Sequence, residues 1–327
     1  MITRPFKHAF ALLALLGVSL VSDRAARADN FALVIGVNTC SQFKINGRVA
    51  IPLRGAKRDA TRFSTFLVDR LGFPKDHVVT LLEEQATHDR VVKEMAELLA
   101  KVTAEDHLVF YFAGHGTRKP DEVGGDEQLG AGGDGFDEAL CLYDCTAQGD
   151  RLLVDDDLQQ WFNKLGSDRV TVVLDCCHSG GGAKSATDDE TPVSRNLPLA
   201  IGAPSLNAKA SWSELASASK GAKRVVAFYA CDSSQSAYER PFRVPVDGDP
   251  QAKGEWVQLG QFTQYLIAAM EDPSADANHD GKMSVGETMD YVRAHIDEDF
   301  NSKRPERKQQ TPTFEAGRTT WEWLTAE

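Results

Sequence analysis

Two short segments of the sequence place a reactive side chain among glycines. His115 stands between Gly114 and Gly116, and Cys177 precedes a His-Ser-Gly-Gly-Gly run. A thiolate is a strong nucleophile once a base accepts its proton, and histidine is a common base. The glycines let a peptide carbonyl approach the N–H groups of Gly116 and Cys177, which could then form an oxyanion hole. Each residue alone would more often be structural, but together they predict a Cys177–His115 dyad.

Both segments follow apolar runs that predict buried strands, at Leu108–Phe112 and Val170–Leu174. Similar runs occur at Phe31–Val37, Val78–Leu82 and Arg224–Tyr229. Apolar residues recur at helical spacing over Arg54–Leu71, Thr87–Val102, Asp155–Leu165, Phe262–Glu271 and Val285–Phe300. This alternation predicts a three-layer α/β fold with a mostly parallel central sheet flanked by helices. Ligands of such sheets bind beyond the carboxyl ends of the strands, where both segments should lie.

Two adjacent cysteines follow the strand at Val170–Leu174. Successive residues of an extended chain point to opposite faces, so Asp175 and Cys177 should share one face and Cys176 the other. One cysteine is then free to enter the cleft while its neighbour enters the core. This alternation of side chains favours Cys177 as the nucleophile.

The first 28 residues have the pattern of a secretory signal peptide. Arg4 and Lys7 precede an apolar stretch over Ala9–Val21, and Ala26-Arg-Ala28 resembles a cleavage site. A retained membrane anchor is the alternative, but 13 apolar residues are too few to span a bilayer. We therefore expect a secreted or periplasmic protein that starts at Asp29 and has no stable membrane insertion.

Composition limits the classes of partner. The 327 residues carry a net charge of −12, which argues against nucleic acid because phosphate binding needs a basic surface. The six cysteines have no spacing typical of a zinc site or a disulfide scaffold.

Several motifs together resemble the caspase/metacaspase family, in particular its bacterial metacaspase-like members. They are FALVIGVN, LRGAKRDA, FYFAGHG, LDCCHSGG, FYACDSSQSAYE and QTPTF. The resemblance implies a caspase-like peptidase domain over residues 29–320. Its large part would be 29–183, its linker 184–223 and its small part 224–320. In the family the nucleophile directly precedes His-Ser-Gly, which implies Cys177, with His178 a neighbour and not the base.

The resemblance also implies polypeptide substrates with Arg or Lys before the cleaved bond. The acidic pocket positions of the family fall on Asp59, Asp175 and Asp232. A guanidinium can neutralise such carboxylates through bidentate hydrogen bonds. The alternatives are a caspase-like preference for Asp and an arginine-specific peptidase of another branch. A different class of function also stays open, a catalytically silent calcium-binding protein with a caspase fold.

A twelve-residue segment at 276–287 fits the EF-hand pattern for Ca²⁺. Its side-chain ligands would come from positions 1, 3, 5 and 12, its carbonyl ligand from position 7 and its sharp turn from Gly281 at position 6. These ligand residues are Asp276, Asn278, Asp280, Lys282 and Glu287. A solvated turn is the alternative, and a single hand favours a structural role. A weaker candidate at Leu153–Leu158 resembles an acidic metacaspase segment, although a helix N-terminus explains its acids equally well.

The segment 184–223 is polar and weakly patterned, which is typical of sites of proteolysis. It carries Lys184, Arg195, Lys209 and Lys220. A peptidase specific for Arg or Lys would meet this linker at high effective concentration. We expect self-cleavage into two associated fragments, with Arg195 as the preferred site because prolines flank it. An ordered linker that cannot reach the cleft is the alternative.

Overall fold

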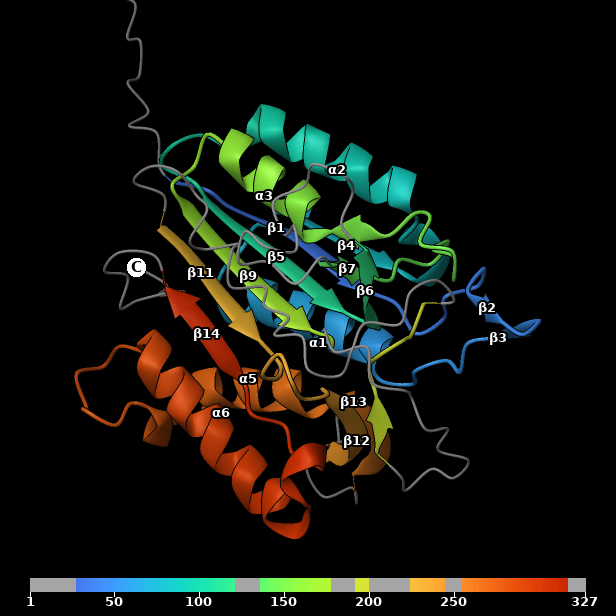
Figure 1. The fold of residues 1–327 in the computed structure, drawn as a ribbon. Coiled ribbons are helices and arrows are strands. Elements are labelled where there is room, and N and C mark those ends of the chain that lie inside the picture. The colour runs from blue at the N-terminus through green and yellow to red at the C-terminus, as the bar shows by residue number, and fades with distance from the viewer. Residues whose placement is uncertain (1–27, 121–135, 178–191, 200–223, 245–253, 317–327) are drawn as a thin grey trace, which may run out of the picture.

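Six strands form the central sheet of the computed structural model, which describes residues 28–120, 136–177, 192–199, 224–244 and 254–316 (Figure 1). The order across the sheet is β14-β11-β9-β5-β1-β4. Five strands run parallel and β14 pairs antiparallel with β11. Their bounds are β1 Asn30–Gly36, β4 Val78–Leu82, β5 His107–Ala113, β9 Arg169–Asp175, β11 Arg224–Tyr229 and β14 Thr313–Ala316. All five strands expected from apolar runs are present, each within one residue of the expected limits.

Helices cover both faces of this sheet and give the three layers (Figure 1). One face carries α2 (His88–Lys101) and α3 (Asp155–Lys164). The other face carries α1 (Ala56–Asp69), α5 (Gln261–Glu271) and α6 (Val285–Asp299). The expected α/β class, with a mostly parallel sheet between helices, is therefore confirmed.

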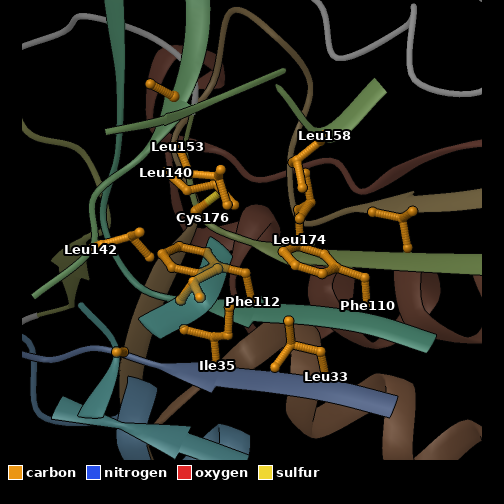
Figure 2. Close-up of a cluster of buried hydrophobic side chains, with 14 of the residues drawn as sticks. Leu33, Ile35, Phe110, Phe112, Leu140, Leu142, Leu153, Leu158, Leu174 and Cys176 are labelled. Carbon is orange, nitrogen blue, oxygen red and sulfur yellow. The ribbon is translucent and has the colours of Figure 1, made fainter. Parts of the chain in front are cut away.

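The alternation of side chains along the strands divides the core into two clusters. Leu33 and Phe110 belong to the cluster under α2 and α3, and Cys176 lies with them (Figure 2). Val34 and Cys177 belong to the cluster on the opposite face. The expected placement of the two cysteines on opposite faces is thus observed, because Cys176 is part of the apolar core and Cys177 faces α1 and α5.

Short strands missed by the sequence patterns form three smaller sheets. A hairpin joins β2 (Lys44–Ile45) and β3 (Arg48–Val49), and a second sheet holds β6 (Gly116–Pro120), β7 (Phe136–Leu140) and β8 (Leu153–Val154). The third sheet has the order β10-β12-β13, with β10 Val193–Ser194, β12 Tyr238–Val244 and β13 Glu255–Gly260. Single turns of 3-10 helix occur at Lys75–His77, Glu83–Gln85, Pro273–Ala275, Asn301–Lys303 and Glu306–Lys308.

One described stretch of the expected linker differs from expectation. Residues 192–199 are not an exposed connection, because Val193–Ser194 forms β10 and Arg195 is fully buried. Residues 1–27 of the expected signal peptide, and residues 184–191 and 200–223 of the expected linker, lie outside the described residues. Within the described ranges, no helix is both long and apolar enough to cross a membrane.

The packing of α1 on the sheet gives a test of the core. Phe63 is fully buried, and its ring stacks on Tyr111 of β5 with 4.3 Å between the centroids. Phe63→Ala should lower the free energy of unfolding by about 3–5 kcal/mol, because it removes buried area and leaves a cavity. Val92→Ala is the control, since Val92 is 36% exposed and its change should stay within about 0.5 kcal/mol. Chemical denaturation measures both, and equal small losses would contradict this packing.

Candidate functional site

The register of β5 and β9 brings the two reactive segments together. These strands are parallel neighbours, and Ala113 pairs with Asp175 at their carboxyl ends. His115 and Cys177 each lie two residues beyond that pair, at the same edge of the sheet. The predicted partners therefore come from adjacent strands, as the dyad requires.

His115 is held by a backbone carbonyl. Its Nε2 lies 3.2 Å from the carbonyl oxygen of Ile51, which can only accept a hydrogen bond, so the neutral ring carries its proton on Nε2. Its Nδ1 is buried and, among the described residues, has no hydrogen-bond partner. Burial lowers the pKa of His115. The nearby Cys40 and the hydrogen bond to the Ile51 carbonyl raise the pKa, but their effect is smaller than that of burial. The ring is thus kept neutral, with Nδ1 free to accept a proton.

The Cys177 thiol is buried but well supplied with hydrogen bonds. Burial would raise its pKa, yet hydrogen bonds from Cys231, from the Ala237 N–H and from Ser194 together hold the pKa below its ordinary value. The Ala237 N–H donates to Sγ over 2.9 Å, and the Ser194 hydroxyl lies 3.8 Å away. These contacts favour a thiolate at Cys177.

Two N–H groups converge on one carbonyl oxygen. The Gly116 N–H donates to the Arg195 oxygen over 2.9 Å, and the Cys177 N–H donates to the same oxygen over 3.3 Å. A Cβ on Gly116 would come within 1.8 Å of the Cys177 carbonyl oxygen, so only glycine permits this approach. The pair has the arrangement of an oxyanion hole, and the Arg195 carbonyl occupies it.

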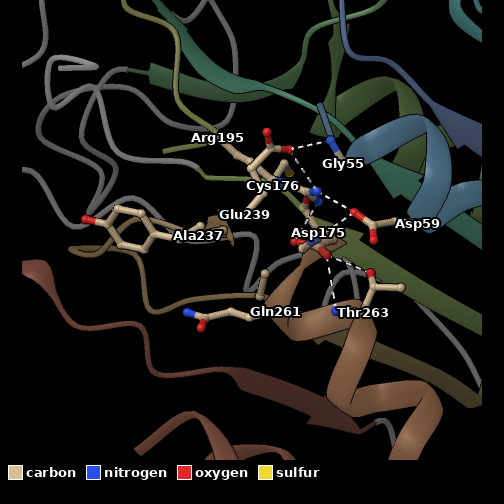
Figure 3. Close-up of polar contacts among 12 residues, drawn as sticks. Gly55, Asp59, Asp175, Cys176, Arg195, Ala237, Glu239, Gln261 and Thr263 are labelled. Carbon is tan, nitrogen blue, oxygen red and sulfur yellow. Dashed lines mark hydrogen bonds and ion pairs between the residues drawn. The ribbon is translucent and has the colours of Figure 1, made fainter. Parts of the chain in front are cut away.

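The side chain of the same residue enters a closed acidic pocket. The Arg195 guanidinium is ion-paired with Asp59 of α1, with Asp175 of β9 at 2.9 Å, and with Glu239 of β12 at 3.6 Å (Figure 3). All four side chains are completely buried. A Cβ on Gly260 would lie 2.7 Å from the guanidinium, so the absence of a side chain there makes room for it.

Hydrogen bonds from the protein orient the carboxylates of this pocket. Asp59 accepts from the Gly260 N–H, and Asp175 accepts from the Thr263 N–H and hydroxyl. Burial raises the pKa of Asp59 to about 7, although Arg195 opposes this shift. The surrounding carboxylates raise the pKa of Arg195 above its already high value, against the effect of burial. The pocket therefore binds a permanent cation.

The segment around Arg195 lies in the site as an extended peptide. Val193 and Ser194 pair antiparallel with β12, and the Arg195 N–H donates to the Ala237 carbonyl over 3.0 Å. Beyond the arginine, the Leu197 N–H donates to the Gly116 carbonyl over 3.0 Å. Backbone hydrogen bonds thus hold the chain on both sides of the bond between Arg195 and Asn196, in the manner of an added strand.

The predicted pocket residues do not all meet. Asp59 and Asp175 contact the same guanidinium, but Asp232 is not among the partners of Arg195. Its carboxylate instead accepts hydrogen bonds from the Ser234 N–H and hydroxyl. The sequence analysis missed Glu239. This residue stands two positions after Ala237 at the end of the FYACDSSQSAYE motif, so the two would share one face of a strand, and that spacing could have identified it.

The EF-hand-like segment has the turn that the pattern requires. Gly281 has a φ of +79°, and its N–H donates to Asp276 over 2.8 Å. Glu287 is held by Ser284, whose N–H and hydroxyl both donate to it. Among the described residues, no three Asp, Glu, His or Cys side chains are placed to hold a metal ion. The other expected ligands stay near the loop backbone, where Asn278 and Asp280 accept from the N–H groups of Asp280 and Lys282 respectively.

The weaker acidic candidate begins a helix. Asp155, Asp156 and Asp157 form the first turn of α3. Negative charge at that position complements the helix dipole, in keeping with the simpler alternative.

Comparisons with known proteins show which family part of the chain resembles. Residues 31–184 match the family model described as "Metacaspase, peptidase C14 domain". The chain is 34% identical to metacaspase-4 of Arabidopsis thaliana over 135 residues, which are 39% of this chain and 30% of that protein. It is 32% identical to metacaspase-1B of Aspergillus fumigatus over 157 residues, or 46% of this chain and 35% of that protein. The matches thus cover about a third of these curated relatives.

A solved structure extends the likeness of the fold. A crystal structure of a Geobacter sulfurreducens protein aligns over 89% of this chain and 94% of its own, with a TM-score of 0.56 and 22% identity. At that identity the likeness concerns the fold alone. The matched segment contains Asp59, His115, Gly116, Asp175 and Cys177, which all take part in the site described above. Residues 31–184, which are 154 of the 327 residues, thus resemble the peptidase domain of the metacaspase family.

Proposed function

We propose that this protein is a cysteine endopeptidase that cleaves peptide bonds after Arg or Lys, and that its first substrate is its own Arg195–Asn196 bond. One observation carries the proposal. The carbonyl of Arg195 accepts from both N–H groups beside the dyad while its guanidinium fills the acidic pocket. A merely structural arginine needs only the second of these contacts.

The chemistry follows from the positions of the groups. The Cys177 thiol loses its proton to Nδ1 of His115, and its sulfur attacks the carbonyl carbon of residue 195. The N–H groups of Gly116 and Cys177 stabilise the negative charge that develops on the oxygen. His115 then returns the proton to the Asn196 nitrogen as the C–N bond breaks, leaving a thioester. Water, deprotonated by His115, hydrolyses the thioester and frees Cys177.

The pocket supports selection of a basic residue. Three buried carboxylates around one cation would repel an acidic side chain, and a neutral one would leave them unpaired at a cost of several kcal/mol. Arg matches the pocket better than Lys, because its planar group reaches two carboxylates at once. A caspase-like preference for Asp is the least compatible with these contacts.

The alternative is a catalytically silent binding protein, and such a protein would need fewer features in the site than an enzyme does. A pure binding protein needs neither an Nδ1 without a partner nor a thiol with a lowered pKa. Both features are present, which favours an enzyme.

The dyad is tested with an arginine-containing fluorogenic peptide. Cys177→Ala and His115→Ala should each lower kcat/KM by at least about 10³-fold, because they remove the nucleophile or its base. Cys176→Ala is the matched control, since this neighbouring thiol faces the apolar core, and it should retain activity. Activity that survives in both dyad variants would refute the assignment.

Self-processing is tested by intact mass analysis of the purified protein. Wild-type protein should yield one fragment from Asp29 to Arg195 and a second that starts at Asn196. The mass of the first fragment also tests the proposed removal of a signal peptide on export. Arg195→Gln should stop the cut, because the pocket then holds no cation, and Cys177→Ala should stop it as well. Arg243→Gln, at an exposed arginine of β12, is the control and should be cut normally. A cut after Arg195 in the Cys177→Ala protein would mean that another protease made it.

We also propose that the segment 276–287 binds Ca²⁺ in a structural role. The left-handed turn at Gly281 and the hydrogen bond from its N–H to the Asp276 carboxylate support this, since an EF-hand loop needs a sharp turn there to bring ligands from several positions around one ion. Glu287 would have to exchange its hydrogen bonds with Ser284 for the ion. The ion would tie the loop before α6 to the first turn of that helix.

Calcium binding is tested by melting temperature. Saturating calcium should raise the Tm of the wild type by about 5 °C or more, because a ligand of the folded state stabilises it. Glu287→Gln keeps an oxygen that can accept from Ser284 but loses the carboxylate, so it should remove most of the rise. Glu306→Gln, at an exposed acid outside the loop, should keep it. If titration calorimetry detects no binding to the wild type, the loop is a plain turn.

A further inference from the structure

A basic groove continues the path of the peptide upstream of Arg195. Its volume is about 950 Å³, and Pro192 lines it together with residues of α1, β12, β13 and the segment after α6. Since Val193 pairs with Glu239, Pro192 lies level with Arg240. A substrate peptide that continued this pairing would extend along β12. The groove therefore lies along the continuation of the pairing between β10 and β12.

The charge of this groove is opposite to that of the whole chain. The net charge of the protein is −12, yet the groove is lined by six cationic side chains and one carboxylate, Asp299. The cationic residues are Arg54, Arg58, Arg240, Lys303, Arg304 and Lys308. Asp299 is already paired with Arg240 at 3.2 Å. The groove thus carries an excess of positive charge.

Several of these cations are accessible to a ligand. Arg58, Lys303 and Lys308 are exposed, and within the described ranges none of the three forms an ion pair. Trp256, which is 70% exposed, adds an aromatic surface to the same groove. Charged and aromatic groups of this kind suit an extended acidic peptide.

The sequence of the chain itself supplies an example of such a peptide. Asp188, Asp189 and Glu190 stand two to four positions before Pro192. The same polypeptide that offers Arg195 to the acidic pocket therefore carries three carboxylates five to seven positions before that arginine in the sequence.

We propose that this groove is a specificity site that binds acidic residues four or more positions before the arginine at the cleaved bond. The inference rests on the proposed peptidase function and adds a second element of substrate selection. The acidic pocket selects one basic residue, and the basic groove selects the acidic stretch that precedes it. Peptides with both features are the preferred substrates.

Two fluorogenic peptides test the proposal on self-processed wild-type enzyme. One is Thr-Asp-Asp-Glu-Thr-Pro-Val-Ser-Arg, and the other replaces its three acids by Asn, Asn and Gln. The acidic peptide should have a kcat/KM about tenfold higher at low ionic strength, since each exposed charge pair contributes a factor of about two. This ratio should fall toward one as salt is added, because the interaction is screened.

Variants of the groove test whether its cations cause the preference for the acidic peptide. In the double variant Arg58→Gln/Lys303→Gln the ratio should fall to about two, the factor expected from one remaining pair. Lys93→Gln/Lys101→Gln removes the same charge from the exposed surface of α2 on the far face of the sheet, and its ratio should equal that of the wild type. Equal cleavage of both peptides by the wild type, or a full preference in the groove variant, would overturn the proposal.

A second measurement separates this proposal from the proposed function. If neither peptide is cleaved, the peptidase function fails, and fluorescence anisotropy with the labelled peptides decides the groove alone. Tighter binding of the acidic peptide that is lost in Arg58→Gln/Lys303→Gln would support the groove. Equal binding of the two peptides would overturn it.

Discussion

The buried guanidinium of Arg195 forms ion pairs with three carboxylates, and these ion pairs connect separate elements of the fold. Asp59, Asp175 and Glu239 come from α1, β9 and β12, and Arg195 comes from a segment that belongs to none of them. Removing these charges from water costs several kcal/mol for each ion, and only close pairing offsets that cost. The pocket is therefore complete only when a cationic side chain is inside it. That requirement fixes both the position of the helix against the sheet and the class of side chain that the cleft accepts.

A second constraint comes from the backbone. His115 and Cys177 meet because β5 and β9 are parallel neighbours in register, and the Gly116 N–H reaches the bound carbonyl because residue 116 has no side chain. The tautomer of His115 is set by the Ile51 carbonyl, which lies in the loop before α1. The reactive groups are thus positioned mainly by main-chain hydrogen bonds, which tolerate little change in the chain path.

The sequence predicted the features that depend on local pattern. Solid apolar runs marked the five parallel strands, and the two-residue period separated Cys176 from Cys177, because both effects arise within a few neighbouring residues. The short strands of the smaller sheets have no such pattern, since partners distant in the chain define them. The Ile51 carbonyl could not be found from residue types, because any residue supplies a carbonyl. The burial of Arg195 was missed for a related reason, since its environment is built by residues from 59 to 260 and its own segment is polar.

The place of β11 in the sheet affects how the molecule would unfold. This strand lies between β9 and β14, and it follows residue 195 in the chain while β9 precedes it. After a cut at that residue, β9 and β11 would be parts of different polypeptides, joined by the ladder of six paired positions between them and by the packing of α1 against α5. A unimolecular folding equilibrium would then become an association of two chains, whose stability depends on protein concentration. Dilution, which has no effect on the intact chain, would favour dissociation of the processed one.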